Sequence, residues 1–382
     1  MPFIWSSEIA KKFYDFVDRT LALRDGMPIE RFSLYCSNTC DYDRAYDCLC
    51  TVVKSKVQKL ELRFPHPKFR VKLCWDLFKT CDTLVELTLR GEFALDVPES
   101  ELLFPCLKKI NLLSIIYSND ESLANLISGC PVLEELFVER HDIGYSDNLQ
   151  MVKVSSRSLK ILRISFLWRH HLDCKVVIDA PNLEYMHILD KISTNYTLMK
   201  PMSRLVEVYI EIRSDINIKT LLSSLSSVKI LTIPTSTLEA LGNGYDVYIP
   251  VFPNLVKFVV GIDLNLGWFL LLPFFESMPN LEHITFLEGL MPCSWSWARN
   301  MFNMRWDPPM EVPHCLGFTM KEIIIKNREA ITHEEYPIIW YLVKYSCHLE
   351  TLTINAYNID PDIRKDVLKF RRGSNLCRIN FI

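Results

Sequence analysis

One short apolar pattern recurs along nearly the whole chain of 382 residues: an apolar residue, two variable residues, a second apolar residue, one variable residue and a third apolar residue. Most copies follow each other at a period typical of proteins built from stacked repeats. One step, from Leu281 to Met320, is clearly longer than the others. The first apolar residues of the fourteen copies are Ile29, Val57, Leu84, Leu107, Leu133, Leu159, Leu183, Leu205, Val228, Leu255, Leu281, Met320, Leu349 and Leu376.

The second and third apolar residues of each copy are two positions apart, so in an extended strand both side chains point to the same face. The pattern therefore predicts a short β-strand in each copy. Between copies, segments such as 44–55 and 118–130 place apolar residues at helical spacing. Strand, turn and helix within one period predict an α/β leucine-rich repeat solenoid, with a curved parallel sheet and helices on the convex side.

The composition excludes several classes of partner. The chain is 49% hydrophobic and 23% charged, and its formal net charge of −3 argues against a basic track for nucleic acid. The most apolar run, 267–275, contains Pro273 and is far shorter than the roughly 20 residues that span a bilayer. Without a secretory signal, the cysteines are interpreted as free thiols. We expect an intracellular protein of the cytoplasm, the nucleus or both, with no membrane partner.

Catalytic and metal-binding motifs fail on inspection. Residues 242–247 begin like a dinucleotide-binding loop but carry Val247 where the third glycine is required. His333 begins a run like that of zinc proteases, but Pro337 occupies the position of the second histidine. A cysteine cluster near the N-terminus lacks the paired spacing of a zinc site, and it consists of Cys36, Cys40, Cys48 and Cys50. We expect no enzymatic activity, no cofactor and no metal.

The one long step between copies contains the sequence WDPPMEVPHCL, residues 306–316. His314 beside Cys315 suggests a metal-ligand pair or a catalytic dyad, but no further ligand stands at a workable spacing. Prolines fix φ and remove backbone donors, so a stiff connector outside the sheet is predicted. Trp306 and Leu316 are expected to anchor its two ends in apolar surface.

The repeats, the opening segment 8–34 and the C-terminal segment 306–327 together resemble the plant F-box/FBD/leucine-rich repeat proteins. The resemblance implies the substrate-recognition part of an SCF-type E3 ubiquitin ligase, in which the F-box docks on an adaptor subunit and the repeats select the target protein. The residues that resemble the start of the FBD domain are Trp306, Pro309, Val312, Pro313, Cys315 and Leu316.

The same resemblance suggests a division of the chain. The first copy already starts at Ile29, residues 6–24 resemble the helix that follows an F-box, and no FLPxxLLxxI-like stretch is present. We therefore expect the F-box itself to be absent, which makes docking on the SCF adaptor doubtful. The predicted parts are an N-terminal helical cap with the first repeat (1–55), the solenoid (56–290), and the connector with an FBD domain that continues the repeats (291–382).

The variable residues beside the strand leucines are expected to face the concave surface of such a solenoid. Aromatic residues among charges are the usual composition of a protein-binding hot spot, and Phe137, Tyr185 and Tyr209 fit it best. A target protein, whose identity the sequence does not give, is predicted to bind there. The candidate partner-binding residues are Phe137, Tyr185, Tyr209, Arg90, Glu135, Glu139, Arg163, His187, Glu207 and Glu211.

Other functions stay open at this point. A hormone-like small-molecule sensor would need a deep concave pocket lined by arginine and aromatic residues. A scaffold outside any ligase, having lost adaptor binding, would use the same surface as a substrate receptor. An enzyme would need titratable groups of adjacent coils within contact distance, for example His170, His171 and His187.

Overall fold

The structure is a computed structural model, in which two compact units are defined. The first comprises Met1–Leu183 with Thr194–Pro201, and the second Glu184–Ser193 with Met202–Ile382. The predicted domain boundaries after residues 55 and 290 stay predictions. The residues that the structure describes are 7–24, 27–36, 41–64, 71–99, 102–140, 149–167, 174–191, 195–213, 215–242, 249–262, 268–290, 306, 308–327, 331, 333, 335–357 and 359–382.

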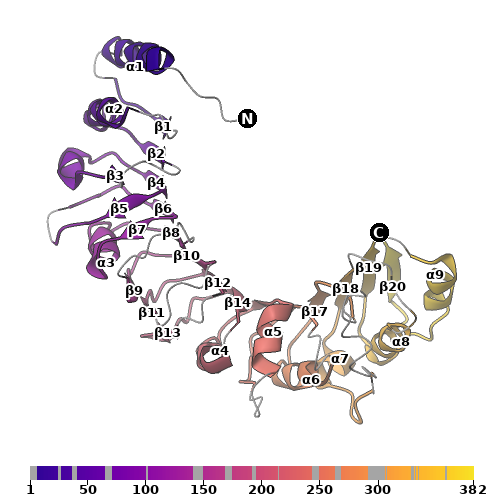
Figure 1. Cartoon of the computed structure of the whole chain (residues 1–382). Coiled ribbons are helices and arrows are strands. Elements are labelled where there is room, and N and C mark those ends of the chain that lie inside the picture. The colour runs from indigo at the N-terminus through magenta and orange to yellow at the C-terminus, as the bar shows by residue number, and fades with distance from the viewer. Residues whose placement is uncertain are drawn as a thin grey trace. The chain divides into compact units, whose positions relative to one another are not determined.

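Fourteen strands of the described chain belong to one parallel sheet, with one strand for each predicted copy (Figure 1). Each strand begins two residues after the first apolar residue of its copy, so the predicted repeat and its solenoid class are confirmed. The strands of the first unit are β1 (Arg31–Tyr35), β2 (Lys59–Phe64), β4 (Glu86–Gly91), β6 (Lys109–Leu113), β8 (Glu135–Arg140) and β10 (Ile161–Phe166). Those of the second unit are β12 (Tyr185–Asp190), β14 (Glu207–Ile212), β15 (Ile230–Ile233), β16 (Lys257–Val260), β17 (His283–Phe286), β18 (Glu322–Asn327), β19 (Thr351–Ala356) and β20 (Arg378–Phe381).

Neighbouring strands within each unit pair at equivalent positions of the repeat. In the first unit Leu60 lies opposite Leu87, and Leu87 lies opposite Ile110. In the second unit Met186 lies opposite Val208 in the same way. The second and fourth residues of these strands are buried, whereas the first and third are half-buried. The apolar positions of successive copies therefore form continuous rows inside the solenoid.

Helices form much of the layer behind the main sheet. The segments at helical spacing, 44–55 and 118–130, fold as α2 and α3, as predicted. Helix α2 turns Leu49, Val52 and other apolar residues toward the core. The helices of the first unit are α1 (Ser7–Ala22), α2 (Tyr42–Lys54), α3 (Glu121–Ser128) and the 3-10 helix η1 (Trp75–Thr80). Those of the second unit are α4 (Asp215–Ser223), α5 (Thr235–Gly242), α6 (Trp268–Ser277), α7 (His314–Phe318), α8 (Tyr336–Tyr345) and α9 (Pro361–Leu368).

Short strands replace helices in part of this layer, which differs from the helical layer that the sequence analysis predicted. Two three-stranded parallel sheets occur in the first unit among the described residues. The signal was present in the sequence, because Val152, Val154, Val176 and Ile178 are β-branched, alternate with period two and are buried. The strands are β3 (Val71–Lys72), β5 (Phe93–Leu95) and β7 (Ile116–Tyr117) in one sheet, and β9 (Met151–Ser155), β11 (Lys175–Asp179) and β13 (Asn195–Leu198) in the other.

Polar side chains at the turn before a strand link successive coils. The Ser158 hydroxyl donates to the carbonyl of Leu133, with 2.8 Å between the oxygens. The Thr83 hydroxyl donates to the carbonyl of Val57 over 3.1 Å. Each donor directly precedes the first apolar residue of its copy. These bonds satisfy carbonyl groups that would otherwise lie near the core without a partner.

The two residues predicted to anchor the connector both pack against other parts of the second unit. Trp306 packs edge-on against Trp268 and Tyr341, at ring-centroid distances of 6.4 Å and 5.3 Å. At the other end Leu316 is buried in α7. Strand β18 then follows and pairs with β17. Both predicted anchor residues are thus packed, and β18, β19 and β20 continue the main sheet of the second unit after them.

We expect Gly91→Ala to destabilise the protein by at least about 2 kcal/mol, because Gly91 has φ +111° and a Cβ there would overlap the carbonyl oxygen of Phe64. Urea unfolding followed by circular dichroism measures the change. The matched control is Gly317→Ala, since a Cβ at Gly317 has no heavy atom within 4 Å, and its expected effect is within about 0.5 kcal/mol. An unchanged midpoint for Gly91→Ala would contradict the described backbone.

Candidate protein-binding surface

The half-buried face of the main sheet carries all the residues predicted to bind a partner. We define the open face as the first, third and fifth residues of each main-sheet strand, which point away from the buried rows. Most of the candidate side chains are half-buried, whereas Arg90 is exposed. The candidates occupy β4 (Arg90), β8 (Glu135, Phe137, Glu139), β10 (Arg163), β12 (Tyr185, His187) and β14 (Glu207, Tyr209, Glu211).

In the first unit Phe137 stands among polar side chains. It lies in register between Asn111 of β6 and Arg163 of β10. Beside it Glu135 forms an ion pair with Lys109, with 3.0 Å between the charged atoms. An aromatic ring with a polar surround is thus present at the predicted position. Glu139 is the last open-face residue of β8, and it lies in register with Ser165 of β10.

Arg90 is further from this ring. It lies in register with Arg63 on one side and Leu113 on the other. Both arginines are exposed, and Arg63 forms an ion pair with Glu61 of its own strand. Strand β6 separates Arg90 from the row that contains Phe137.

In the second unit the structure brings five candidates together in an aromatic–acidic patch, which we define as Tyr185, His187, Glu207, Tyr209 and Glu211. The His187 ring stacks on the Tyr209 ring, with centroids 4.2 Å apart and an interplanar angle of 3°. The hydroxyl oxygen of Tyr185 lies 3.5 Å from Nδ1 of His187. The Tyr209 hydroxyl donates to Oε2 of Glu211 over 2.7 Å. Four residues of the patch are therefore directly connected, and Glu207 lies in register with Tyr185 beside them.

The electrostatics of the patch favour a cationic group from outside. Burial, and secondly the hydrogen bond to Glu211, raise the pKa of Tyr209 above its usual value, so its hydroxyl remains a donor at neutral pH. Within the described part of the chain, neither Glu207 nor Glu211 has a lysine, arginine or histidine at ion-pair distance. Elsewhere on the open face Glu135 is paired with Lys109 and Glu322 with His283.

The sequence analysis missed the part of the open face that follows the patch. Ile230 and Thr232 of β15 lie in register with Glu207 and Tyr209. The row of Thr232 then continues across β16, β17 and β18 with β-branched side chains, which are half-buried except for the buried Thr285. The same alternation, applied to the later copies, would have identified these residues. We call this row the β-branched strip, and it consists of Ile230, Thr232, Val259, Thr285 and Ile324.

The structure does not bring the residues considered for metal or catalytic sites together in one site. His314 is exposed and stacks on Phe318, whereas Cys315 is buried, and this burial raises the pKa of its thiol to about 12. In the described ranges no group of three or more histidine, cysteine, aspartate or glutamate side chains could hold a metal ion. The described ranges also contain no helix with both the length and the apolar character needed to cross a bilayer. Several residues considered in the sequence analysis lie outside the described ranges: His170, His171, Cys40 and 243–247.

Comparison with known proteins identifies the family. A family model for the leucine-rich repeats of the FBD-associated F-box protein At5g56370 matches residues 47–207. The F-box protein At3g62430 of Arabidopsis thaliana is 31% identical over 397 residues, which cover 98% of this chain and 87% of the relative. The chain belongs to the F-box/FBD/LRR-repeat family. The predicted resemblance is thereby confirmed.

Two further relatives from Arabidopsis thaliana are also similar to this chain over nearly its whole length. The F-box/FBD/LRR-repeat protein At2g26030 is 28% identical over 415 residues, covering 97% of this chain and 87% of the relative. The FBD-associated F-box protein At4g10400 is 26% identical over 382 residues, covering 99% and 88%. A protein-interaction module within this family is the function class that these similarities support.

We expect Tyr209→Phe to lower stability near neutral pH by about 0.5–1.5 kcal/mol, because the bond to Glu211 is lost. The pKa of Tyr209 is higher in the folded protein than in the unfolded chain. The Tyr209 hydroxyl therefore makes its full contribution to the free energy of unfolding below the ordinary tyrosine pKa of about 10, and it loses this contribution as pH rises toward the pKa in the folded protein. Urea unfolding at about pH 8 and about pH 11 should therefore show a smaller gap between wild type and variant at the higher pH. A gap that widens would contradict the described hydrogen bond.

Proposed function

We propose that the open face binds a target protein, and that the chain supplies the substrate-recognition part of an SCF-type E3 ubiquitin ligase F-box protein. The observation that carries the proposal is the aromatic–acidic patch, in which stacked rings stand beside two carboxylates that no described cation pairs with. Buried aromatic anchors dominate the energy of protein interfaces. The rigid sheet beneath holds these rings in place, so little order has to be gained on binding.

The chemistry of the patch favours a lysine or arginine side chain of the target. Such a group would pair with Glu207 and Glu211 and lie against the face of the Tyr209 or Tyr185 ring. The adjoining β-branched strip would contact apolar residues next to that cation. A basic residue flanked by aliphatic residues is therefore the kind of target segment that the second unit fits best.

The proposal assigns no catalytic role to the chain. Residues 1–28 contain no stretch that resembles the adaptor-docking motif, so adaptor docking is not assigned to the residues printed here. A scaffold outside any ligase would use the same open face. Recovery of ubiquitin-ligase subunits together with the target distinguishes the ligase role from the scaffold role.

Affinity capture from plant extract tests the binding surface. We expect the wild-type chain to retain one or more proteins that Tyr185→Ala combined with Tyr209→Ala retains at least about tenfold less well, because a loss of about 1.4 kcal/mol in binding has that effect. Retention by a separate Phe137→Ala variant tests whether the aromatic ring on the open face of the first unit also contributes to binding.

The matched control replaces exposed aromatic residues that lie off the open face. Phe318→Ala combined with Tyr357→Ala changes side chains that are 66% and 92% exposed. Its retained proteins should equal those of the wild type. Equal retention by the control and by the Tyr185/Tyr209 variant would refute the assignment of the surface.

Charge reversal tests the preference for a cationic target. Glu207→Lys combined with Glu211→Lys should abolish retention of the same proteins, and retention by the wild type should fall with rising salt, since surface charge pairs weaken as ionic strength rises. The control variant is Glu276→Lys with Glu350→Lys, both exposed in the second unit and off the open face. Tighter retention after reversal at the patch would show that the target is acidic there.

A further inference from the structure

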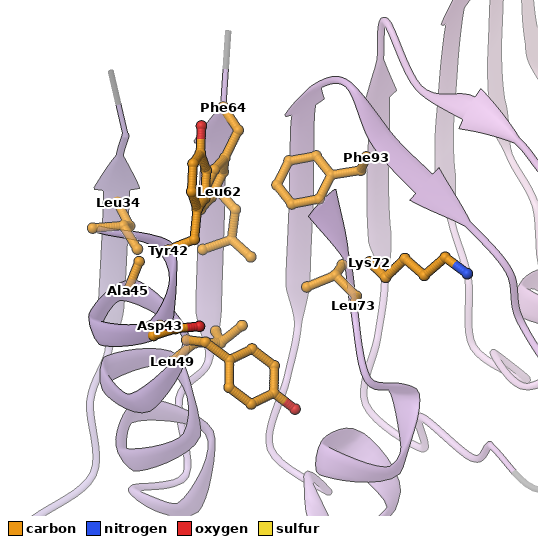
Figure 2. A pocket seen from close by; sticks show the side chains of 11 residues that line it. Leu34, Tyr42, Asp43, Ala45, Leu49, Leu62, Phe64, Lys72, Leu73 and Phe93 are labelled. Atoms are coloured by element: carbon orange, nitrogen blue, oxygen red, sulfur yellow. The ribbon is translucent and has the colours of Figure 1, made fainter. Parts of the chain in front are cut away.

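A cavity of about 240 Å³ lies in the first unit, on the buried side of the main sheet (Figure 2). Leu34 of β1 and Leu62 of β2 line it, and both belong to the buried rows. Ala45 and Leu49 of α2 line it from behind. The cavity is therefore on the opposite side of the sheet from the open face.

The layer behind the sheet differs between the first and second coils, and this difference explains why the cavity remains between them. Helix α2 backs the first coil, whereas strand β3 and the 3-10 helix η1 back the next one. A helix with its side chains is about 10 Å wide, while a strand occupies about 4.8 Å in the plane of its sheet. Leu73 of the second coil and Phe93 of the third coil, in β5, face the cavity but do not close it.

Aromatic rings form one continuous wall of the cavity. Tyr42 stacks on Phe64, with ring centroids 5.9 Å apart and 24° between the planes. Phe64 meets Phe93 edge to face at 5.0 Å and 74°. An apolar cavity of about 150 Å³ in another protein holds a single benzene ring, so a larger aromatic cavity has room for a two-ring molecule.

Two charged side chains, Asp43 and Lys72, are among the residues that line the cavity. Asp43, in the first turn of α2, turns its carboxylate toward the cavity, and no described residue is bonded to it (Figure 2). The Lys72 side chain extends away from the other lining residues, with its ammonium group at the far end (Figure 2). No described cation pairs with the Asp43 carboxylate, so this group can accept a hydrogen bond from a ligand. The same carboxylate repels an anionic ligand.

We propose that this cavity binds a small neutral aromatic molecule of about two fused rings, whose hydroxyl or amine group donates to Asp43. The rings would lie against Phe64 and Phe93, and the donor would point to the mouth of the cavity. This inference goes beyond target binding, because a ligand here would occupy the core side of the sheet and leave the open face free.

Isothermal titration of the full chain with 2-naphthol and with 2-naphthoate tests the proposal. We expect saturable binding of one molecule of 2-naphthol, and binding of the anionic 2-naphthoate that is at least about tenfold weaker. Asp43→Asn should reduce this preference to less than about threefold, since the amide no longer repels the carboxylate. Asp47→Asn is the control, because Asp47 is exposed on the same helix and does not line the cavity.

A second variant fills the space directly. Ala45→Leu adds three carbon atoms inside the cavity and should reduce the affinity for 2-naphthol at least about tenfold, with a circular dichroism spectrum like that of the wild type. Because Asp43 is exposed, Asp43→Asn should fold like the wild type. Its result therefore tests the proposal even if Ala45→Leu does not fold. Failure of 2-naphthol to bind in a saturable manner, or binding that neither variant alters, would overturn the proposal.

Discussion

Parallel pairing between equivalent strands is the interaction on which the rest of this structure depends. A single coil is too small to bury its own apolar face, so it is stable only when a neighbour covers it. Pairs such as Leu60 with Leu87 and Met186 with Val208 keep the apolar rows continuous. A slip of one residue would turn every buried side chain of a strand toward solvent, which makes the register strongly preferred.

Because the strands hold the coils together, the layer behind them can vary. Helix α2, the 3-10 helix η1 and the short strands of the β9–β11–β13 sheet all perform the same task of covering buried residues. Their widths differ, and the cavity next to Phe64 and Phe93 lies where a helix is followed by a strand. Variation in the outer layer thus creates a feature that the regular repeat would not have.

The same register that buries one set of side chains presents another set to partners. Tyr209 lies opposite His187 because both are third residues of their strands, and the short distance between paired strands lets their rings stack. The family similarity indicates a protein-interaction module, and four residues of the patch form a connected group of side chains on its open face. Open positions can change without disturbing the buried rows, so the side chains that occupy them are free to differ from one such protein to another.

The sequence alone determined the repeat, the presence of a strand in every copy and the open-face residues as far as β14, because strand alternation is local and was read directly from the copies. It also contained the alternating β-branched residues of β9 and β11, although the expectation of helices obscured them. Only the tertiary structure decided that His187 stacks on Tyr209, that Tyr209 donates to Glu211 and that Asp43 faces a cavity. These features depend on packing between separate coils and on rotamers within one strand, where ring orientation and unfilled volume are set by neighbours that no local pattern describes.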